Sequence, residues 1–234
     1  MAAPNRLRPD RYPHTPTVDQ HDTYHGTTVP DPYRWLEDTD DPDVLAWTKA
    51  QHDLARSILD RLPGRDDDRR RLTELWDYPR MGPPVERGGR LFYTRNDGLQ
   101  AQSVLYVREP RGKERVLLDP NSLSDDGTVA LMEWEPSPDG RMLAYNLSES
   151  GEDWRIARVR DVVTGDDLQD RLERIKFSPL AWDAQSDGFF YSRFPEVPEG
   201  DVGLFTDMSV RFHRLGTDQA DDDLVFANPD EPEL

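Results

Sequence analysis

The sequence predicts a mainly β fold: about three blades of an incomplete β-propeller, preceded by a helical N-terminal arm. Three times, a glycine-containing turn leads into a short apolar strand that ends in tyrosine. The turn glycines, which are 51 and 48 residues apart, are Gly89, Gly140 and Gly188. A repeat of about fifty residues with several strands is typical of a propeller blade. Propellers close with about four to eight blades, so we expect three blades to form part of a larger structure.

Two further apolar stretches follow the first strand of each copy. The expected second strands are 103–108, 155–160 and 210–215, and the expected third strands are 116–118, 175–177 and 224–226. Short strands separated by turns that contain Gly, Asp and Asn are typical of an all-β domain. We therefore assign residues 77–234 to the partial propeller.

Residues 1–76 form the predicted arm, which begins with an extended, proline-rich segment over 1–30. A helix is expected to start at Asp40, Asp41 and Pro42, because acids and proline favour the first turn. Pro63 and Gly64 are expected to end this helix. A second short helix is predicted over 66–76, before prolines and Gly82 mark the change to β structure.

The charge of the chain limits its partners. The formal net charge is −18, which argues against nucleic acid, since phosphate binding needs a basic surface. Among the basic residues, 26 are Arg and 3 are Lys. A GC-rich genome and adaptation to high salt are both compatible with this composition, and a salt titration of stability separates them.

Other features of the sequence bear on compartment and cofactors. There is no cysteine, no apolar run of membrane-spanning length, and no apolar core for a secretory signal in the polar residues 1–13, so a cytoplasmic location is the default expectation. His21 and His25 have the spacing of a helical metal site, but the flanking Gly26–Pro30 favours an extended segment instead. The acidic runs 66–68 and 221–223 are expected to be solvated surface or turns, with calcium binding the alternative. No cofactor and no metal are predicted.

Catalytic motifs are missing from the sequence. No glycine has serine two residues later, so the Gly-x-Ser-x-Gly turn of a serine hydrolase is absent. Phosphate-loop, dinucleotide and His-Glu-x-x-His motifs are absent too. No catalytic residue is assigned. From the residues alone, Asp153 is expected in a turn and Phe177 on a strand, alternating with Ile175 in the blade core.

Many short motifs resemble those of the prolyl oligopeptidase (prolyl endopeptidase) family of serine peptidases. They lie at 22–26 (Asp-Thr-Tyr-His-Gly), 29–38 (Val-Pro-Asp-Pro-Tyr-Arg-Trp-Leu-Glu-Asp), 72–80, 96–100, 103–107, 116–121, 123–131, 176–178 (Lys-Phe-Ser) and 213–217 (His-Arg-Leu-Gly-Thr). The resemblance covers nearly the whole chain in order. It departs at Gly203–Val210, where the family usually has a longer polar loop.

The resemblance implies a seven-bladed propeller that restricts entry to short peptides, and an arm that packs on a C-terminal α/β-hydrolase domain. It implies that this hydrolase domain, with its Ser, Asp and His triad, is missing from the chain. It also implies two substrate-binding residues. Phe177 corresponds to an aromatic residue that lines the pocket for the substrate residue before proline, and Asp153 to an acid near an active-site arginine.

Two functions remain open at this point. The first is the N-terminal fragment of a proline-specific serine endopeptidase, inactive alone, whose complete form cleaves short proline-containing peptides. The second is a non-catalytic β-propeller-like module that binds peptides or a protein partner. Open blade edges disfavour the second as a stable monomer, because unpaired strands invite association. Apolar arm residues such as Trp35 and Trp47 are also expected to need a covering surface.

Overall fold

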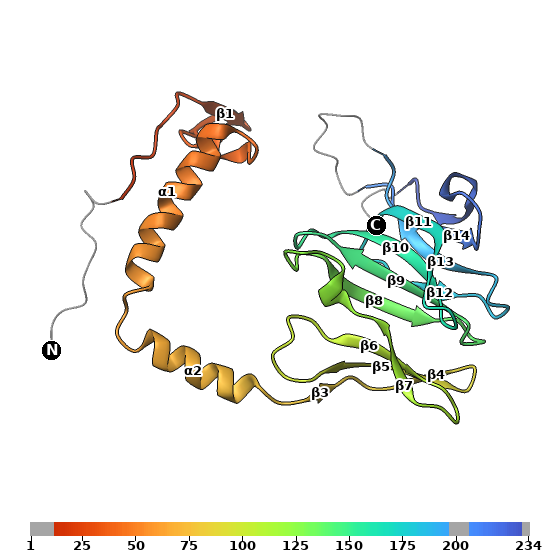
Figure 1. Ribbon diagram of the computed structural model, residues 1–234. Helices are drawn as coiled ribbons and strands as arrows, with labels where there is room; N and C mark the ends of the chain where they lie inside the picture. Colours follow the sequence, from red (N-terminus) through yellow and green to blue (C-terminus); the bar gives the residue numbers. More distant parts are fainter. Residues whose placement is uncertain (1–11, 197–205, 231–234) are drawn as a thin grey trace. The chain divides into compact units, whose positions relative to one another are not determined.

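The computed structural model describes residues 12–196 and 206–230, and the chain divides into two compact units, Met1–Glu74 and Leu75–Leu234. The first unit holds a two-stranded hairpin, a 3-10 helix and α-helical segments (Figure 1). These elements are β1 (His21–Tyr24), β2 (Thr27–Pro30), η2 (Arg34–Glu37), α1 (Pro42–Leu59) and α2 (Arg65–Trp76), whose last two residues lie in the second unit.

Helix α1 begins where the sequence predicts. The Asp41 side chain accepts a hydrogen bond of 2.7 Å from the backbone N–H of Asp43, and Pro42 occupies the first turn. This arrangement satisfies an N–H group that a helix end otherwise leaves unpaired. The helix ends at Leu59, before the predicted stop at Pro63. The segment expected to be extended includes the β1–β2 hairpin, which sequence reasoning did not identify.

The second unit consists of three antiparallel sheets in chain order (Figure 1). The first sheet contains β3 (Arg80–Met81), β4 (Val85–Arg87), β5 (Arg90–Asn96), β6 (Val104–Arg108) and β7 (Glu114–Leu118). The second contains β8 (Ala130–Pro136), β9 (Met142–Ser148), β10 (Trp154–Asp161) and β11 (Asp167–Lys176). The third contains β12 (Ala181–Trp182), β13 (Gly188–Arg193), β14 (Ser209–Arg214) and β15 (Asp223–Ala227). Short 3-10 helices lie at Pro120–Ser122 (η3) and Gln219–Asp221 (η4).

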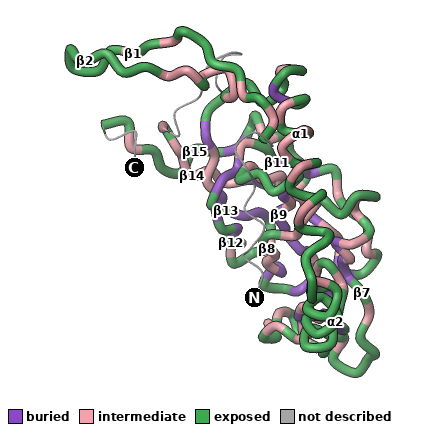
Figure 2. Tube along the Cα trace, turned by 90° about the vertical axis from the view of Figure 1, so that its left-hand side faces the viewer, coloured by how far each residue is buried: buried purple, intermediate pink, exposed green. Residues whose placement is uncertain are grey.

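Successive sheets share hydrophobic cores. Phe92, Leu105 and Leu118 of the first sheet pack with Leu143 and Tyr145 of the second. The second and third sheets share another cluster, made of Ala144, Ala157, Val159, Leu172, Ile175, Leu180, Phe189 and Tyr191. Figure 2 shows the buried residues concentrated in the strands, whereas α2 is exposed or nearly so. The apolar strands of the repeat therefore form two cores between three sheets.

The described strands confirm most of the predicted repeat. Each predicted first, second and third strand overlaps an observed strand of its sheet. The sequence did not reveal β8 and β12, which precede the glycine turns and bring the second and third sheets to four strands each. Phe177 is a correction, because it lies just beyond β11 with a backbone φ of +51° and is 67% exposed. It belongs to neither the strand nor the blade core.

The acidic runs differ from each other. Asp66, Asp67 and Asp68 lie exposed in the first turn of α2, as expected. Asp222 contradicts the surface interpretation of the second run, since it is 7% exposed and hydrogen-bonded to His213.

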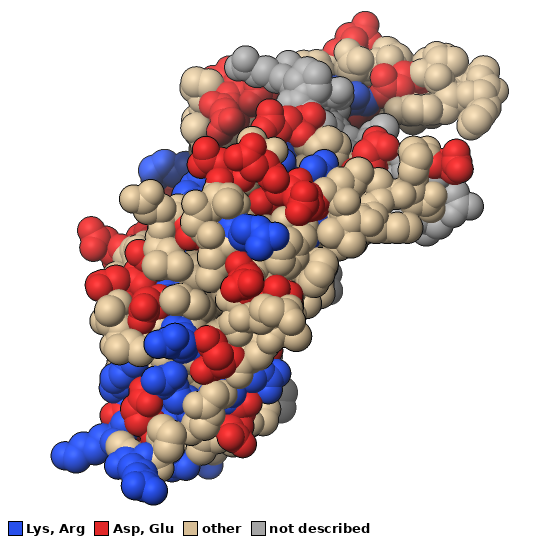
Figure 3. Space-filling model, turned by 90° about the vertical axis from the view of Figure 1, so that its right-hand side faces the viewer, with Lys and Arg blue, Asp and Glu red and all other residues tan. Residues whose placement is uncertain are grey.

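Over the described residues, no cluster of His, Asp or Glu is arranged to hold a metal ion. On the face drawn in Figure 3, acidic and basic side chains are interspersed.

Three further expectations concern chain segments. His21 lies in β1 and His25 in the following turn, so the pair does not share a helix. The first part of the divergent loop Gly203–Val210 lies outside the described residues. Within the part that the structure describes, no helix is long and apolar enough to span a membrane.

Candidate substrate-binding site at the end of β10 and β11

Asp153 and Phe177 meet because of the register between two strands. In the antiparallel pair β10–β11, Trp154 lies opposite Lys176. Asp153 directly precedes Trp154, and Phe177 directly follows Lys176. Pairing of this kind brings residues that are distant in sequence to the same end of a sheet. The two predicted site residues are therefore neighbours in space.

Lys176 links the two predicted residues. Its Nζ lies 3.1 Å from Oδ2 of Asp153 and 5.3 Å from the ring centre of Phe177. The same ammonium lies 5.5 Å from the ring centre of Trp154. Lys176 is only 8% exposed, whereas the Asp153 side chain is 57% exposed. A largely buried cation thus holds the accessible carboxylate beside the accessible aromatic ring.

The backbone of Phe177 is strained. A φ of +51° is rare for a residue with a side chain, and such conformations cost about 1–3 kcal/mol and concentrate at functional sites. Arg174, three residues earlier, also has a positive φ of 61°. A bulky aromatic residue held in this conformation and left 67% exposed gains little from burial. These properties mark Phe177 as a surface available for contact.

A second ion pair lies near the Phe177 ring. Arg155 has its guanidinium carbon 6.0 Å from the Phe177 ring centre, and its Nη1 lies 3.4 Å from Oε2 of Glu133. The buried amide of Asn146 donates to the main-chain oxygen of Ser178 at 3.3 Å. Two cations, each paired with a carboxylate, thus lie within about 6 Å of the centre of the exposed ring.

Aromatic packing anchors the base of the site. Trp154 meets Phe194 of the third sheet region edge-on, with ring centres 5.8 Å apart. The guanidinium carbon of Arg174 lies 4.4 Å from the Trp154 ring centre, and its Nη2 donates to the Pro195 oxygen at 2.7 Å. Contacts of this kind between a cation and an aromatic ring are favourable when partly desolvated. These contacts hold Trp154, the first residue of β10, against the segment that follows β13.

Sequence reasoning missed Lys176, Arg155 and Glu133 as members of this site. Lys176 was visible within the Lys-Phe-Ser motif, but nothing local shows that it pairs with Asp153. Glu133 and Arg155 are 22 residues apart and come together only through the sheet. The register of the strands, which the sequence does not specify, supplies this information.

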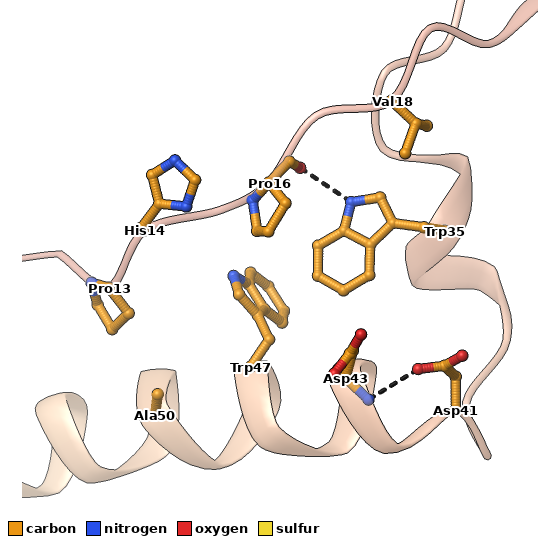
Figure 4. A pocket seen from close by; sticks show the side chains of 9 residues that line it. All are labelled: Pro13, His14, Pro16, Val18, Trp35, Asp41, Asp43, Trp47 and Ala50. Carbon is orange, nitrogen blue, oxygen red and sulfur yellow. Dashed lines mark hydrogen bonds between the residues drawn. The ribbon is translucent and has the colours of Figure 1, made fainter.

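A separate cavity of about 520 Å³ lies within the first unit (Figure 4). Trp35 and Trp47 pack edge-to-face there, with ring centres 6.2 Å apart. Their indole N–H groups donate to the Pro16 oxygen at 2.9 Å and to Oγ1 of Thr15 at 3.0 Å. The extended segment of the arm therefore covers part of the two tryptophans, which were expected to need a cover from elsewhere.

Comparison with known proteins decides the family. Residues 13–234 match the family model described as the prolyl oligopeptidase N-terminal beta-propeller domain. The chain belongs to the prolyl oligopeptidase family. It is 39% identical over 218 residues to a prolyl endopeptidase of Elizabethkingia meningoseptica, covering 92% of this chain and 31% of that protein. It is 35% identical to a dual function macrocyclase-peptidase of Galerina marginata, covering 96% of this chain and 34% of that one.

Solved structures agree with this assignment. A prolyl endopeptidase studied for the role of inter-domain dynamics in catalysis and specificity superposes with a TM-score of 0.86 at 37% identity, over 93% of this chain and 33% of that one. Prolyl oligopeptidase B from Galerina marginata, bound to a 35mer hydrolysis and macrocyclization substrate, gives a TM-score of 0.83 at 31% identity, with 97% and 35% covered. This chain thus spans about a third of the length of these relatives.

Proposed function

We propose that the chain is the arm and partial propeller of a proline-specific serine endopeptidase, whose catalytic triad lies in a hydrolase domain outside these residues. The proposed arm, 1–76, packs on that domain. Exposed apolar side chains on its helices and on the segment between them support this role, since solvent-exposed apolar surface often marks an interface. They are Leu45, Leu59, Leu62, Leu72, Leu75 and Trp76.

We further propose that Phe177 and Asp153 contact the peptide substrate. The observation that supports this is the Asp153–Lys176–Phe177 arrangement, in which a largely buried lysine orients an accessible carboxylate and an accessible, strained aromatic ring. The ring suits an apolar residue of a short peptide, and the carboxylate suits a cation on the peptide or on the hydrolase domain. In the complete enzyme, the propeller restricts access to short proline-containing peptides.

The chain alone is expected to cleave no peptide, because its sequence lacks the serine nucleophile motif. The test is release of a chromophore from a short peptide with proline before the leaving group, measured beside circular dichroism of the same sample. A binding module, the alternative function, would bind such peptides without cleaving them, and calorimetry distinguishes that result. Cleavage that persists through repeated purification would overturn the proposal.

Phe177→Ala in the complete enzyme is expected to raise KM for short proline-containing peptides about tenfold, equivalent to about 1.4 kcal/mol of lost apolar contact. The kcat is expected to change little, because the ring lies outside the proposed triad. The measurement is steady-state kinetics with several peptides that differ in the residue before proline.

Val163→Ala is the matched control for this variant. Val163 is 62% exposed and lies in the turn that joins the opposite ends of β10 and β11. Its replacement removes apolar surface from the same strand pair at a distance from the site, so KM should stay at the wild-type value. An unchanged KM for Phe177→Ala with every peptide would rule out the assignment of Phe177.

A further inference from the structure

A buried histidine connects the second and third sheets through hydrogen bonds. His213 lies in β14 and is fully buried. Its Nε2 lies 2.9 Å from Oδ1 of Asp170 in β11, and its Nδ1 lies 2.7 Å from Oδ1 of Asp222, just after η4. The ring therefore joins a carboxylate of the second sheet to a carboxylate of the third.

The two carboxylates define the protonation state of the ring. An ionised carboxylate only accepts hydrogen bonds, so a ring with an acceptor at both nitrogens needs a proton on both. Asp170 Oδ1 also accepts the backbone N–H of Gly216 at 2.7 Å, and Asp222 Oδ2 accepts the hydroxyl of Tyr191 at 2.6 Å. Both carboxylates therefore have a further hydrogen-bond donor besides the imidazole ring.

Every element packed against the ring contributes to its surroundings. Strand β11 supplies Asp170, the segment after η4 supplies Asp222, and β13 supplies Tyr191. The Phe189 ring, also from β13, packs 5.5 Å from the imidazole centre. These titratable groups comprise two acids and a tyrosine.

The balance of forces favours the charged ring. Burial is the largest single influence and disfavours the charge, but hydrogen bonds and charge attraction from Asp170 and Asp222 outweigh it and raise the pKa of His213 to about 9. Burial likewise opposes ionisation of Asp170. The His213 ring and the Gly216 N–H overcome that effect and hold the pKa of Asp170 below its usual value.

The contacts of this boundary continue along β11 and into the segment that follows it. Gln219 of η4 donates from its amide to the Glu173 oxygen at 3.0 Å and accepts the Glu173 N–H at 3.1 Å. The Ser192 N–H donates to Oγ of Ser178 at 2.7 Å. These contacts are exposed or half-exposed, whereas the His213 cluster is shielded from water. The hydrogen bonds and charges of the His213 cluster therefore have the larger effect on the stability of the boundary.

We propose that His213 is a buried imidazolium that locks the third sheet to the second, and that loss of its proton under alkaline conditions releases the lock. The neutral ring keeps one donor and faces the other carboxylate with a lone pair. That leaves a buried charge poorly satisfied, which weakens the contact between β14 and β11.

The pH dependence follows from the sign of the shift. A raised folded-state pKa stabilises the fold fully below the unfolded value of about 6.5, and this stabilisation is lost as the pH rises through about 9. Between pH 7 and 9.5, the unfolding equilibrium constant is expected to rise roughly 50-fold through this group. A histidine with the same pKa, about 6.5, in the folded and unfolded states would leave the unfolding equilibrium constant unchanged over this range.

The test compares urea unfolding of the full chain with that of His213→Gln between pH 7 and 9.5. The wild type is expected to show the roughly 50-fold rise and His213→Gln to lack it. His52→Gln, at an exposed position in α1, serves as the control and should follow the wild type. Parallel pH dependence of the wild type and His213→Gln would overturn the proposal.

A second variant keeps the proposal testable if His213→Gln does not fold. Asp170→Asn retains an acceptor of similar shape but removes one negative charge beside the ring. Proton NMR of the imidazole is expected to show His213 titrating near pH 9 in the wild type and at lower pH in Asp170→Asn. Titration near 6.5 in the wild type, or an identical value in Asp170→Asn, would contradict the lock.

Discussion

Gly88→Ala is expected to destabilise the chain by about 3 kcal/mol or more, the largest effect of any single methyl group that we predict. Gly88 has a φ of +55°, and a Cβ at this position would overlap the main-chain oxygen of Asp139. The turn of the second sheet contacts the same place from the other side, since a Cβ on Gly140 would lie 2.5 Å from the Arg87 oxygen. Neither backbone can move without separating the first two sheets.

Gly127→Ala is the control that separates the cost of a positive φ from the cost of steric overlap of the added Cβ. Gly127 also has a positive φ, of 71°, but an added Cβ would meet nothing within 4 Å. Only the conformational term remains, so a loss of about 1 kcal/mol is expected. Urea unfolding at pH 7 measures both variants. Equal losses of stability for Gly88→Ala and Gly127→Ala would show that the turn at Gly88 is not in tight contact with the turn at Gly140.

Phe189→Ala is expected to lower the free energy of unfolding by about 3–5 kcal/mol, because it empties a fully buried position. The Phe189 ring packs against Trp182, Tyr191 and His213, with ring centres 5.4, 6.3 and 5.5 Å away. These contacts lie within the core between the second and third sheets. The same urea unfolding experiment measures this loss.

Phe190→Ala is the matched control, since it removes the same side chain one position along the same strand. Phe190 faces the opposite side of the third sheet, is 36% exposed, and packs 4.9 Å from the ring centre of Phe212. A loss of about 1 kcal/mol is expected there, because less apolar surface leaves water. Comparable losses at 189 and 190 would contradict the placement of the core.

The sequence was sufficient for the elements that carry local signals. Turn glycines predicted the strands that contain Tyr93, Tyr145 and Tyr191, although each strand continues beyond its tyrosine, and Asp41 with Pro42 predicted the start of α1. β12 was missed because it has two residues and follows no turn glycine, and β8 was missed because it follows the Gly127 turn without the closing tyrosine that marks the repeat. Such strands form through pairing with a neighbour rather than from their own pattern.

The candidate site was less accessible to sequence reasoning. Alternation with Ile175 suggested that Phe177 continues the strand, but a positive φ at Phe177 turns the chain there. No periodic pattern reports such a turn in a residue other than glycine. The partner of Asp153 likewise depends on the pairing of Trp154 with Lys176. Family resemblance selected Asp153 and Phe177, and the register explains why they are neighbours.

Strand β9 belongs to both cores at once. Leu143 and Tyr145 point into the cluster shared with the first sheet, whereas Ala144 lies in the cluster shared with the third. Among the described residues, the cores join each sheet to its nearest neighbour, as in a one-dimensional array, and β9 contributes side chains to both cores. A substitution that moves β9 toward one core moves it away from the other. Substitutions in β9 that are tolerated by both cores therefore limit how independently the packing of the two outer sheets can evolve.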